Sequence, residues 1–239
     1  MENVAIGLMT WKRIPSLRET LEDLSAQTFK NFTLYISNGN LEQSEHVESI
    51  IKRYGKRLKI VLSHDGNDIK TFRRLYLGRK MAEDGAKTIL FIDDDIDYAP
   101  RYVASALKEY EPKTYKSGFA WSFHEGGIDY YGKRTRRWDN EHRVHYCGTG
   151  VGMIDPSIFF DDGLLDAPEE AYGIEDLWLS YYADHVLSWK LKYMRVKDKF
   201  TINGADEVAL YKQYLNAEYS KADFLRQLVS MGWRVEDGE

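Results

Sequence analysis

The sequence predicts an α/β fold in which a mainly parallel central sheet is flanked by helices on both faces. Strand-length apolar runs alternate with amphipathic helical patterns over residues 4–92, and the apolar runs are nearly continuous. Alternating strands and helices form parallel sheets with right-handed crossovers, and continuous apolar strands are typical of sheets buried on both faces. The chain has 239 residues, 43% of them hydrophobic and 30% charged, which is ordinary globular composition.

The first half of the chain repeats a strand–helix unit. The apolar runs predict strands at 4–9, 32–37, 58–63 and 88–92. Helical patterns lie between them, at 16–27, 43–54 and 70–84. The first helix opens on a capping box formed by Ser16 and Glu19. Polar clusters follow all four strands, so we expect these clusters to share one edge of the sheet, where ligands bind in such folds.

The second half is less regular. Its patterns predict a helix at 101–110, strands near 117–123, 144–154 and 191–196, a helix opened by the segment 173–176, and a C-terminal helix. Tyr219, Phe224, Leu225 and Leu228 form an apolar stripe on that last helix, which favours packing on its own domain over a partner or membrane surface. No Pro-, Gly- or Ser-rich linker separates the halves, so we expect one domain.

Composition restricts the class of protein. The lone Cys147 cannot form an internal disulfide, so we expect a reducing, cytoplasmic location. No apolar stretch approaches the roughly 20 residues that cross a bilayer, and the N-terminus lacks a basic region and a cleavage site. A net charge of −5 disfavours a nucleic-acid-coating protein. The exception is a basic, aromatic-flanked segment at 132–138.

The fourth predicted strand runs into three carboxylates, Asp93, Asp94 and Asp95. On an extended segment Asp93 and Asp95 face the same way while Asp94 points elsewhere. Converging carboxylates favour a hard divalent cation such as Mg²⁺ or Mn²⁺, which leaves positions free for phosphate oxygens. Asp also suits turns at strand ends, but an Asp-x-Asp after the fourth strand of an alternating pattern favours the metal.

The order of these motifs resembles GT-A glycosyltransferases of the family 2 type, which transfer sugars from nucleotide diphosphates with inversion. The matching motifs span about residues 4–196 and are Thr10-Trp11-Lys12-Arg13, Gln27-Thr28-Phe29, Asn31-Phe32, Asp93-x-Asp95 and Glu175-Asp176. The chain departs from the family at Ser37-Asn38-Gly39, where an acidic residue often follows the second strand, and at Arg73-Arg74, where Arg-Asn is usual.

The resemblance implies roles for individual residues. At the nucleotide sugar it places Thr10, Trp11, Arg13, Asn38, Asp65, Arg74, Asp93 and Asp94. It assigns Asp95, with Asp93, to a Mn²⁺ or Mg²⁺ ion that neutralises the departing nucleoside diphosphate. It divides the chain into a nucleotide-sugar-binding half (1–98), an acceptor and catalytic half (99–200) and a C-terminal helical extension (201–239).

The acceptor hydroxyl needs a general base, for which Asp176 is the first candidate and Glu175 the second. Successive helical residues point about 100° apart, so one of the two faces the sugar. Acids in a first helical turn also stabilise the helix dipole without any catalysis. The arrival of the pair behind glycines and after the Asp-x-Asp favours catalysis.

Two other segments leave alternatives open. The alternate glycines of residues 146–152 indicate either a strand that lines the donor-sugar pocket or a tight strand crossing, with Cys147 a small core residue. The basic segment, with Lys133, Arg134, Arg136 and Arg137 beside Tyr130, Tyr131 and Trp138, indicates either a lid or acceptor platform or a solvated loop. The histidines, among them His124, show no metal-ligand spacing.

These observations predict an inverting, metal-dependent enzyme that moves a hexose or deoxyhexose from a nucleotide sugar, UDP-sugar favoured, to a hydroxyl of a glycan acceptor. We expect no nucleic-acid partner and no transmembrane span, with peripheral membrane contact left open. The alternatives are a nucleotidyltransferase, a non-catalytic sugar-nucleotide or glycan-binding module, and a glucosyltransferase of modified DNA bases. The glycine-poor TWKRIPS loop counts against the first of these.

Overall fold

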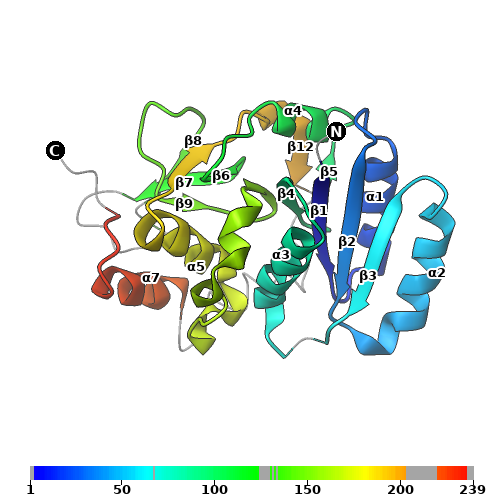
Figure 1. Cartoon of the computed structure of the whole chain (residues 1–239), viewed down its shortest axis with the longest axis horizontal. Helices are drawn as coiled ribbons and strands as arrows, with labels where there is room; N and C mark the ends of the chain where they lie inside the picture. Colours follow the sequence, from blue (N-terminus) through cyan, green and yellow to red (C-terminus); the bar gives the residue numbers. More distant parts are fainter. Residues whose placement is uncertain are drawn as a thin grey trace.

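A seven-stranded sheet runs through the middle of the protein, in a computed structural model that describes residues 3–66, 68–123, 130, 132, 134–202 and 220–235 (Figure 1). The strand order is β11-β6-β10-β4-β1-β2-β3. These strands are β1 Val4–Thr10, β2 Phe32–Asn38, β3 Lys59–His64, β4 Thr88–Ile92, β6 Thr114–Ser117, β10 Val151–Ile154 and β11 Lys190–Tyr193. Only β10 is antiparallel to its neighbours. The predicted α/β class with a mainly parallel sheet is confirmed.

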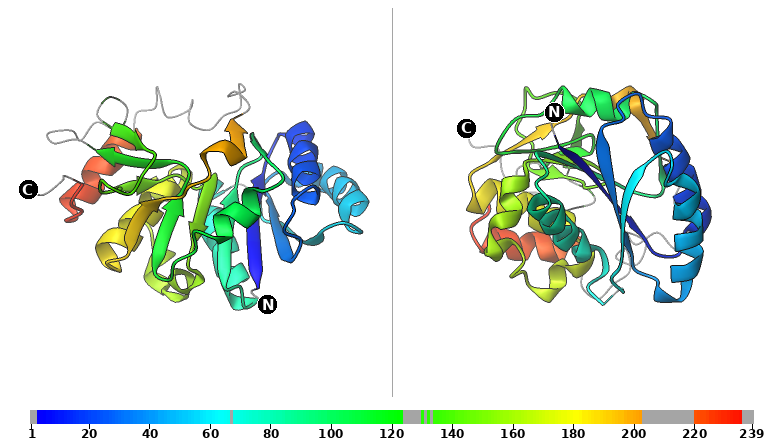
Figure 2. Two further views of the ribbon diagram at one scale, coloured as in Figure 1. Left: turned by 90° about the horizontal axis from the view of Figure 1, so that it is seen from above. Right: turned by 45° about the vertical axis from the view of Figure 1, so that its right-hand side comes forward.

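Helices cover both faces of the sheet at its β1–β3 end. Helices α1 (Ile14–Ser25) and α2 (Ser44–Tyr54) lie on one face, and α3 (Arg73–Glu83) lies on the other (Figures 1 and 2). The two-residue period of a strand explains this arrangement. Val4, Ile6 and Leu8 of β1 belong to the apolar core that contains α1 and α2, whereas Ala5 belongs to the core that contains α3.

Smaller elements complete the second half. Two further sheets pair β12 (Phe200–Ile202) with β5 (Ile96–Tyr98), and β7 (Ala120–Phe123) with both β8 (Arg134–Arg137) and β9 (Tyr146–Cys147). The helices are α4 Tyr102–Leu107, α5 Glu175–Tyr181 with a following π turn η6 Tyr182–Val186, and α7 Lys221–Ser230. Short 3₁₀ turns are η1 Leu41–Gln43, η2 Lys70–Phe72, η3 Pro156–Phe160, η4 Asp162–Leu164, η5 Glu169–Gly173 and η7 Lys197–Lys199.

Two of the predicted strands are each divided in the structure. The strand expected near 117–123 is split into β6 and β7, which belong to different sheets, and the one expected at 144–154 is split into β9 and β10 by a turn at 148–150. Close packing at Gly118 explains the first break, since a Cβ there would lie 2.8 Å from Val151 and 2.9 Å from Phe200. Both breaks leave backbone bends beside the carboxyl end of β4.

The C-terminal helix packs on the protein's own core, as predicted. Phe224, Leu225 and Leu228 of α7 are fully buried in the core cluster that contains α5, while Tyr219 lies outside the described residues. Ser220 caps the helix with a capping box completed by Asp223. Across the described part of the chain, no helix has the length and apolar character needed to span a membrane.

The close contact between α3 and η3 gives a test of the packing. A Cβ on Gly78 would lie 2.3 Å from the Phe159 ring, so Gly78→Ala should lower the free energy of unfolding by about 1–3 kcal/mol through overpacking. Gly55 at the end of α2 is the matched control, because its φ is −60° and nothing lies within 3.8 Å of an added Cβ. Gly55→Ala should raise the stability by about 0.4–1 kcal/mol. Urea unfolding measures both, and equal effects would contradict this packing.

Candidate active site

The carboxyl ends of the first four strands lie along one edge of the sheet. The register aligns Thr10 with Asn38 and Asn38 with His64, and it pairs Leu8 of β1 with Ile92 at the end of β4. The polar residues that follow these strands are therefore neighbours in space, which confirms the prediction that they share one rim.

The three carboxylates that follow β4 lie in a turn rather than on an extended segment. Asp94 and Asp95 form the turn between β4 and β5, so the predicted extended geometry is wrong. Asp93 and Asp95 are 34% and 31% exposed and Asp94 is 9% exposed, but Asp95 shares an arginine with Asp94 and not with Asp93. Arg13, the residue that precedes α1, contacts Asp94 at 3.1 Å and Asp95 at 2.9 Å. Asp93 instead contacts a different arginine.

This turn carries more negative charge than its arginine contacts balance. Burial raises the pKa of Asp94 to about 7, against the opposing effect of Arg13. The pKa of Asp95 is raised first by burial and then by the neighbouring Asp93 carboxylate, and Arg13 offsets this only in part. The Asp93 carboxylate thus acts on Asp95 as a neighbouring like charge.

The second arginine, Arg74 in the first turn of α3, joins the two acidic motifs. Its side chain is only 4% exposed, and its Nη2 lies 2.6 Å from Asp93 Oδ1. Its Nε lies 3.0 Å from Glu175 Oε1, an ionic contact without hydrogen-bond alignment. Thr149 donates a hydrogen bond of 3.2 Å to the same Glu175 oxygen. Burial alone would lower the pKa of Arg74, but Asp93 and Glu175 outweigh it and raise that pKa.

Asp176, the first candidate for the general base, lies at the start of α5 and is 15% exposed. It accepts a hydrogen bond from the hydroxyl of Tyr146, which in turn accepts one from Tyr130 at 3.1 Å. The ammonium group of Lys221 in α7 lies 3.5 Å from Asp176 Oδ2. Burial would lower the pKa of Lys221, yet Asp176, Tyr130 and Glu175 together raise it. Asp176 thus has one cationic and one hydroxyl neighbour.

The residues predicted to bind the nucleobase of the donor surround the ends of β1, β2 and β3. Asn38 is fully buried, and its amide contacts the Asn40 carbonyl at 2.9 Å and His64 Nδ1 at 3.0 Å. Asp65 accepts hydrogen bonds of 2.6 Å from Ser37 and from Ser63. The Lys12 ammonium group lies 4.2 Å from the centre of the Trp11 ring, and Thr10 is buried.

A buried arginine that the sequence analysis did not select lies beneath this part of the rim. Arg73 donates hydrogen bonds to the carbonyls of Thr10 at 2.9 Å and Gly66 at 2.8 Å. A Cβ on Gly39 would lie 1.6 Å from the Arg73 guanidinium, so only glycine fits there. Burial lowers the pKa of Arg73 to about 10. In the sequence, the one sign of this contact is Gly39, the glycine that follows β2. It becomes informative only once Arg73 is known to pack against it.

The remaining predictions for single residues have clear outcomes. Cys147 is fully buried and burial raises the pKa of its thiol, which confirms a core residue. A Cβ on Gly150 would lie 2.2 Å from Asp93 Oδ2, so this glycine admits the carboxylate. Lys133, Tyr131 and His124 lie outside the described residues, while Arg134 and Arg136 lie on strand β8.

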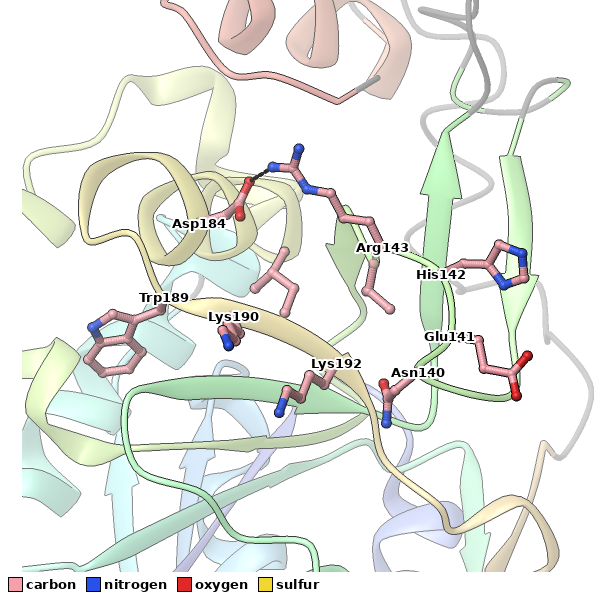
Figure 3. A pocket seen from close by; sticks show the side chains of 10 residues that line it. Asn140, Glu141, His142, Arg143, Asp184, Trp189, Lys190 and Lys192 are labelled. Atoms are coloured by element: carbon pink, nitrogen blue, oxygen red, sulfur yellow. Dashed lines mark hydrogen bonds and ion pairs between the residues drawn. The ribbon is translucent and has the colours of Figure 1, made fainter. Parts of the chain in front are cut away.

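A separate groove opens beside the edge strand β11, away from these residues (Figure 3). Its volume is about 270 Å³, and it lies between the segment 140–144 and the start of β11. Asp184 and Arg143 form an ion pair of 3.0 Å across it. Strands β6 and β10 separate β11 from β4, and none of the predicted site residues lines the groove.

Comparisons with solved structures identify the fold. The chain is similar to S. aureus TarS 1–349 in complex with UDP, with a TM-score of 0.59 and 14% identity over 96% of this chain and 70% of that one. It is similar to the same S. aureus TarS fragment in complex with UDP-GlcNAc, with a TM-score of 0.55 and 13% identity over 96% and 71% of the two chains. It is also similar to the mannosyltransferase PcManGT from Pyrobaculum calidifontis in complex with GDP-Man and Mn²⁺, with a TM-score of 0.61 and 11% identity over 97% and 69%.

These likenesses define the class of fold. The chain has a GT-A-like glycosyltransferase fold, as the sequence motifs predicted. No protein-family model and no curated protein matches the sequence.

The buried arginine that joins the acidic motifs gives a test of the site's electrostatics. Arg74→Met should lower the free energy of unfolding by about 3–5 kcal/mol, because it leaves Glu175, only 5% exposed, without its cation. Adding Glu175→Gln should recover part of this loss, since the double variant buries no unpaired charge there. The control is Arg57→Met, which breaks an exposed pair with Glu22 and should cost at most about 1 kcal/mol. Urea unfolding measures the free energy of unfolding of all variants. If the losses from Arg74→Met and Glu175→Gln simply add in the double variant, the two side chains are not coupled.

Proposed function

We propose that this protein is an inverting glycosyltransferase that moves a hexose or deoxyhexose from a nucleotide diphosphate sugar, UDP-sugar favoured, to a hydroxyl of a glycan acceptor. The observation that carries the proposal is the contact of Arg74 with both Asp93 and Glu175. This contact brings the carboxylates that follow β4 next to the acidic pair that opens α5. In this proposal the donor-binding and base functions would lie side by side on the rim of a GT-A-like fold.

A divalent cation fits the donor side of this rim. The donor set is two partly exposed carboxylates, Asp93 and Asp95, and the missing side chain at Gly150 makes room for the Asp93 carboxylate itself. Among the described residues no group of three or more His, Cys, Asp or Glu is placed to hold a metal ion by itself. Two carboxylates suit Mn²⁺ or Mg²⁺, which bind through few protein ligands and substrate phosphates. When bound, the ion neutralises charge on the leaving diphosphate.

The chain's own side chains supply the remaining functions. Arg13 and Arg74 hold the three carboxylates of the turn in place, so the acidic rim exists before any ligand arrives. The nucleobase of the donor would lie at the ends of β1–β3, which are framed by Thr10, Trp11, Asn38 and Asp65. Asp176 would take the proton from the acceptor hydroxyl as that oxygen attacks the anomeric carbon and the bond to the diphosphate breaks.

Glu175 is less suited to the role of base than Asp176. Its side chain is buried and paired with Arg74 and Thr149, so it serves to position the start of α5. Asp176 has the larger exposed fraction, 15% against 5%. The contact with Lys221 places a cation beside the carboxylate of this proposed base.

Donor binding is tested by thermal shifts with a panel of nucleotide sugars, with and without Mn²⁺. A ligand at about 100 times its Kd stabilises the folded state by roughly 2.7 kcal/mol, and each kcal/mol raises Tm by about 2–4 °C in a protein of this size. Asp95→Ala should lose the Mn²⁺-dependent part of the shift. The control is Asp162→Ala, whose side chain is 91% exposed and remote from the rim. No shift with any nucleotide sugar would refute the proposal.

Catalysis is tested by Asp176→Asn, which keeps the size of the side chain and removes its basicity. Transfer should fall by about 10²–10⁴-fold, while the donor-induced thermal shift persists. Asp162→Asn is again the control and should transfer sugar at the normal rate. Chromatography measures the nucleoside diphosphate formed from the donor during transfer. Normal transfer by the Asp176→Asn variant would rule out the assigned base.

A further inference from the structure

Cationic and aromatic side chains alternate across the small sheet β8-β7-β9. The Arg136 guanidinium lies 4.1 Å from the ring centre of Trp138 and 4.8 Å from that of Phe119. The Arg134 guanidinium lies 4.1 Å from the ring centres of both Trp121 and Tyr130. In an antiparallel pair, neighbouring side chains on one face meet across strands, and the β7–β8 register pairs Trp121 with Arg136.

Two lysines extend this row at its ends. Lys197 lies 4.8 Å from the Trp138 ring centre, and Lys221 lies 5.2 Å from that of Tyr130. Lys221 is also the cation that contacts Asp176. We call the whole row the cation–arene ladder; its members are Lys197, Trp138, Arg136, Phe119, Trp121, Arg134, Tyr130 and Lys221. One end of the ladder therefore meets the candidate base.

The charge of the ladder is largely uncompensated. Within the described ranges no carboxylate lies within ion-pair distance of Arg134, Arg136 or Lys197, in contrast to Arg143, which pairs with Asp184 at 3.0 Å. The Nε of Arg136 is buried without a hydrogen-bond partner among those residues, and its Nη2 donates to the Gly118 carbonyl at 3.2 Å. In a protein of net charge −5, Arg134 and Arg136 of this small sheet and the neighbouring Lys197 thus have no carboxylate partner among the described residues.

Stacking on arenes prepares these arginines to bind anions. An aromatic ring contacts the face of a guanidinium, and the N–H donors project from its edge in the same plane. The ring fixes the orientation of the plane and leaves edge donors for carboxylate or phosphate oxygens. A solvated surface arginine has no such support and loses more side-chain entropy on binding.

From these contacts we propose that the cation–arene ladder is the binding surface for an acidic glycan acceptor, one that carries carboxylate or phosphate groups along its chain. The proposal rests on the proposed glycosyltransferase function and adds the acceptor class to it. Anionic groups would contact Lys197, Arg136 and Arg134 in turn. The acceptor hydroxyl would then lie beyond Tyr130, next to Asp176.

Binding of defined probes to the full-length protein tests this surface. Isothermal titration compares an oligogalacturonate with its methyl-esterified, uncharged form, and with a phosphorylated malto-oligosaccharide and a short duplex DNA. We expect the acidic saccharides to bind and the uncharged form to bind at least about tenfold more weakly, because charge-assisted hydrogen bonds are lost. The carboxylate and phosphate arms identify which anion is preferred.

Variants connect the binding to the ladder. Arg134→Gln with Arg136→Gln should weaken acidic-saccharide binding by about tenfold or more, and Lys197→Gln, at an exposed position, should weaken it by a smaller factor without risk to folding. The matched control is Arg18→Gln with Arg53→Gln on α1 and α2, which removes the same charge from the other end of the molecule (Figure 1). The control should bind as the parent protein does.

Several outcomes would overturn the proposal. These are equal binding of the charged and uncharged saccharides, no binding of any probe, equal losses in ladder and control variants, or duplex DNA that binds as well as the saccharides. The nucleotide-sugar thermal shift of the ladder variants distinguishes the two proposals. If the ladder variants keep the nucleotide-sugar shift and also bind the acidic saccharides as the parent protein does, the acceptor surface is wrong and the donor site stands.

Discussion

The buried guanidinium of Arg74 is the interaction on which the rim depends. It lies in the first turn of α3 and holds one carboxylate from the end of β4 and one from the start of α5. Arg74 and Glu175 are both taken out of water, which is unfavourable unless each finds an opposite charge. The two acidic motifs are therefore stable in this position only together, with the arginine between them. Residues adjacent in the sequence could not provide this arginine bridge. The arginine comes from α3, before β4, and the second carboxylate comes from α5, which follows several strands later.

Most of the fold could be predicted from the sequence because its first half consists of local patterns. The apolar runs and helical stripes are properties of neighbouring residues, and the strand alternation of Val4, Ile6 and Leu8 against Ala5 reproduces the two-faced core. The shared rim followed from parallel topology alone. The divided strands were not predictable in this way, because the break at Gly118 comes from contacts with Val151 and Phe200, which are distant in sequence.

The candidate site was predictable to a smaller degree. Asp93, Asp95, Glu175 and Asp176 stood out because acids at strand and helix ends follow a pattern along the chain. Tyr146, Thr149 and Lys221 did not, since a tyrosine, a threonine and a lysine carry no signal until tertiary packing brings them to a carboxylate. The turn at 94–95 was also missed, because the apolar run before it suggested a continued strand. Its three acids comprise one buried and two partly exposed side chains.

The two sides of the proposed site have opposite electrostatic character. On the donor side, the carboxylates of Asp93, Asp94 and Asp95 lie beside only two arginines, so we expect an anionic diphosphate to be repelled unless a cation comes with it. On the acceptor side, Arg134, Arg136 and Lys197 of the ladder have no carboxylate partners among the described residues and would attract anions directly. The contact between Lys221 and Asp176 lies where the two sides meet. A free acidic glycan would thus be drawn to the ladder and repelled by the metal-free rim, which keeps each substrate on its own side of the base.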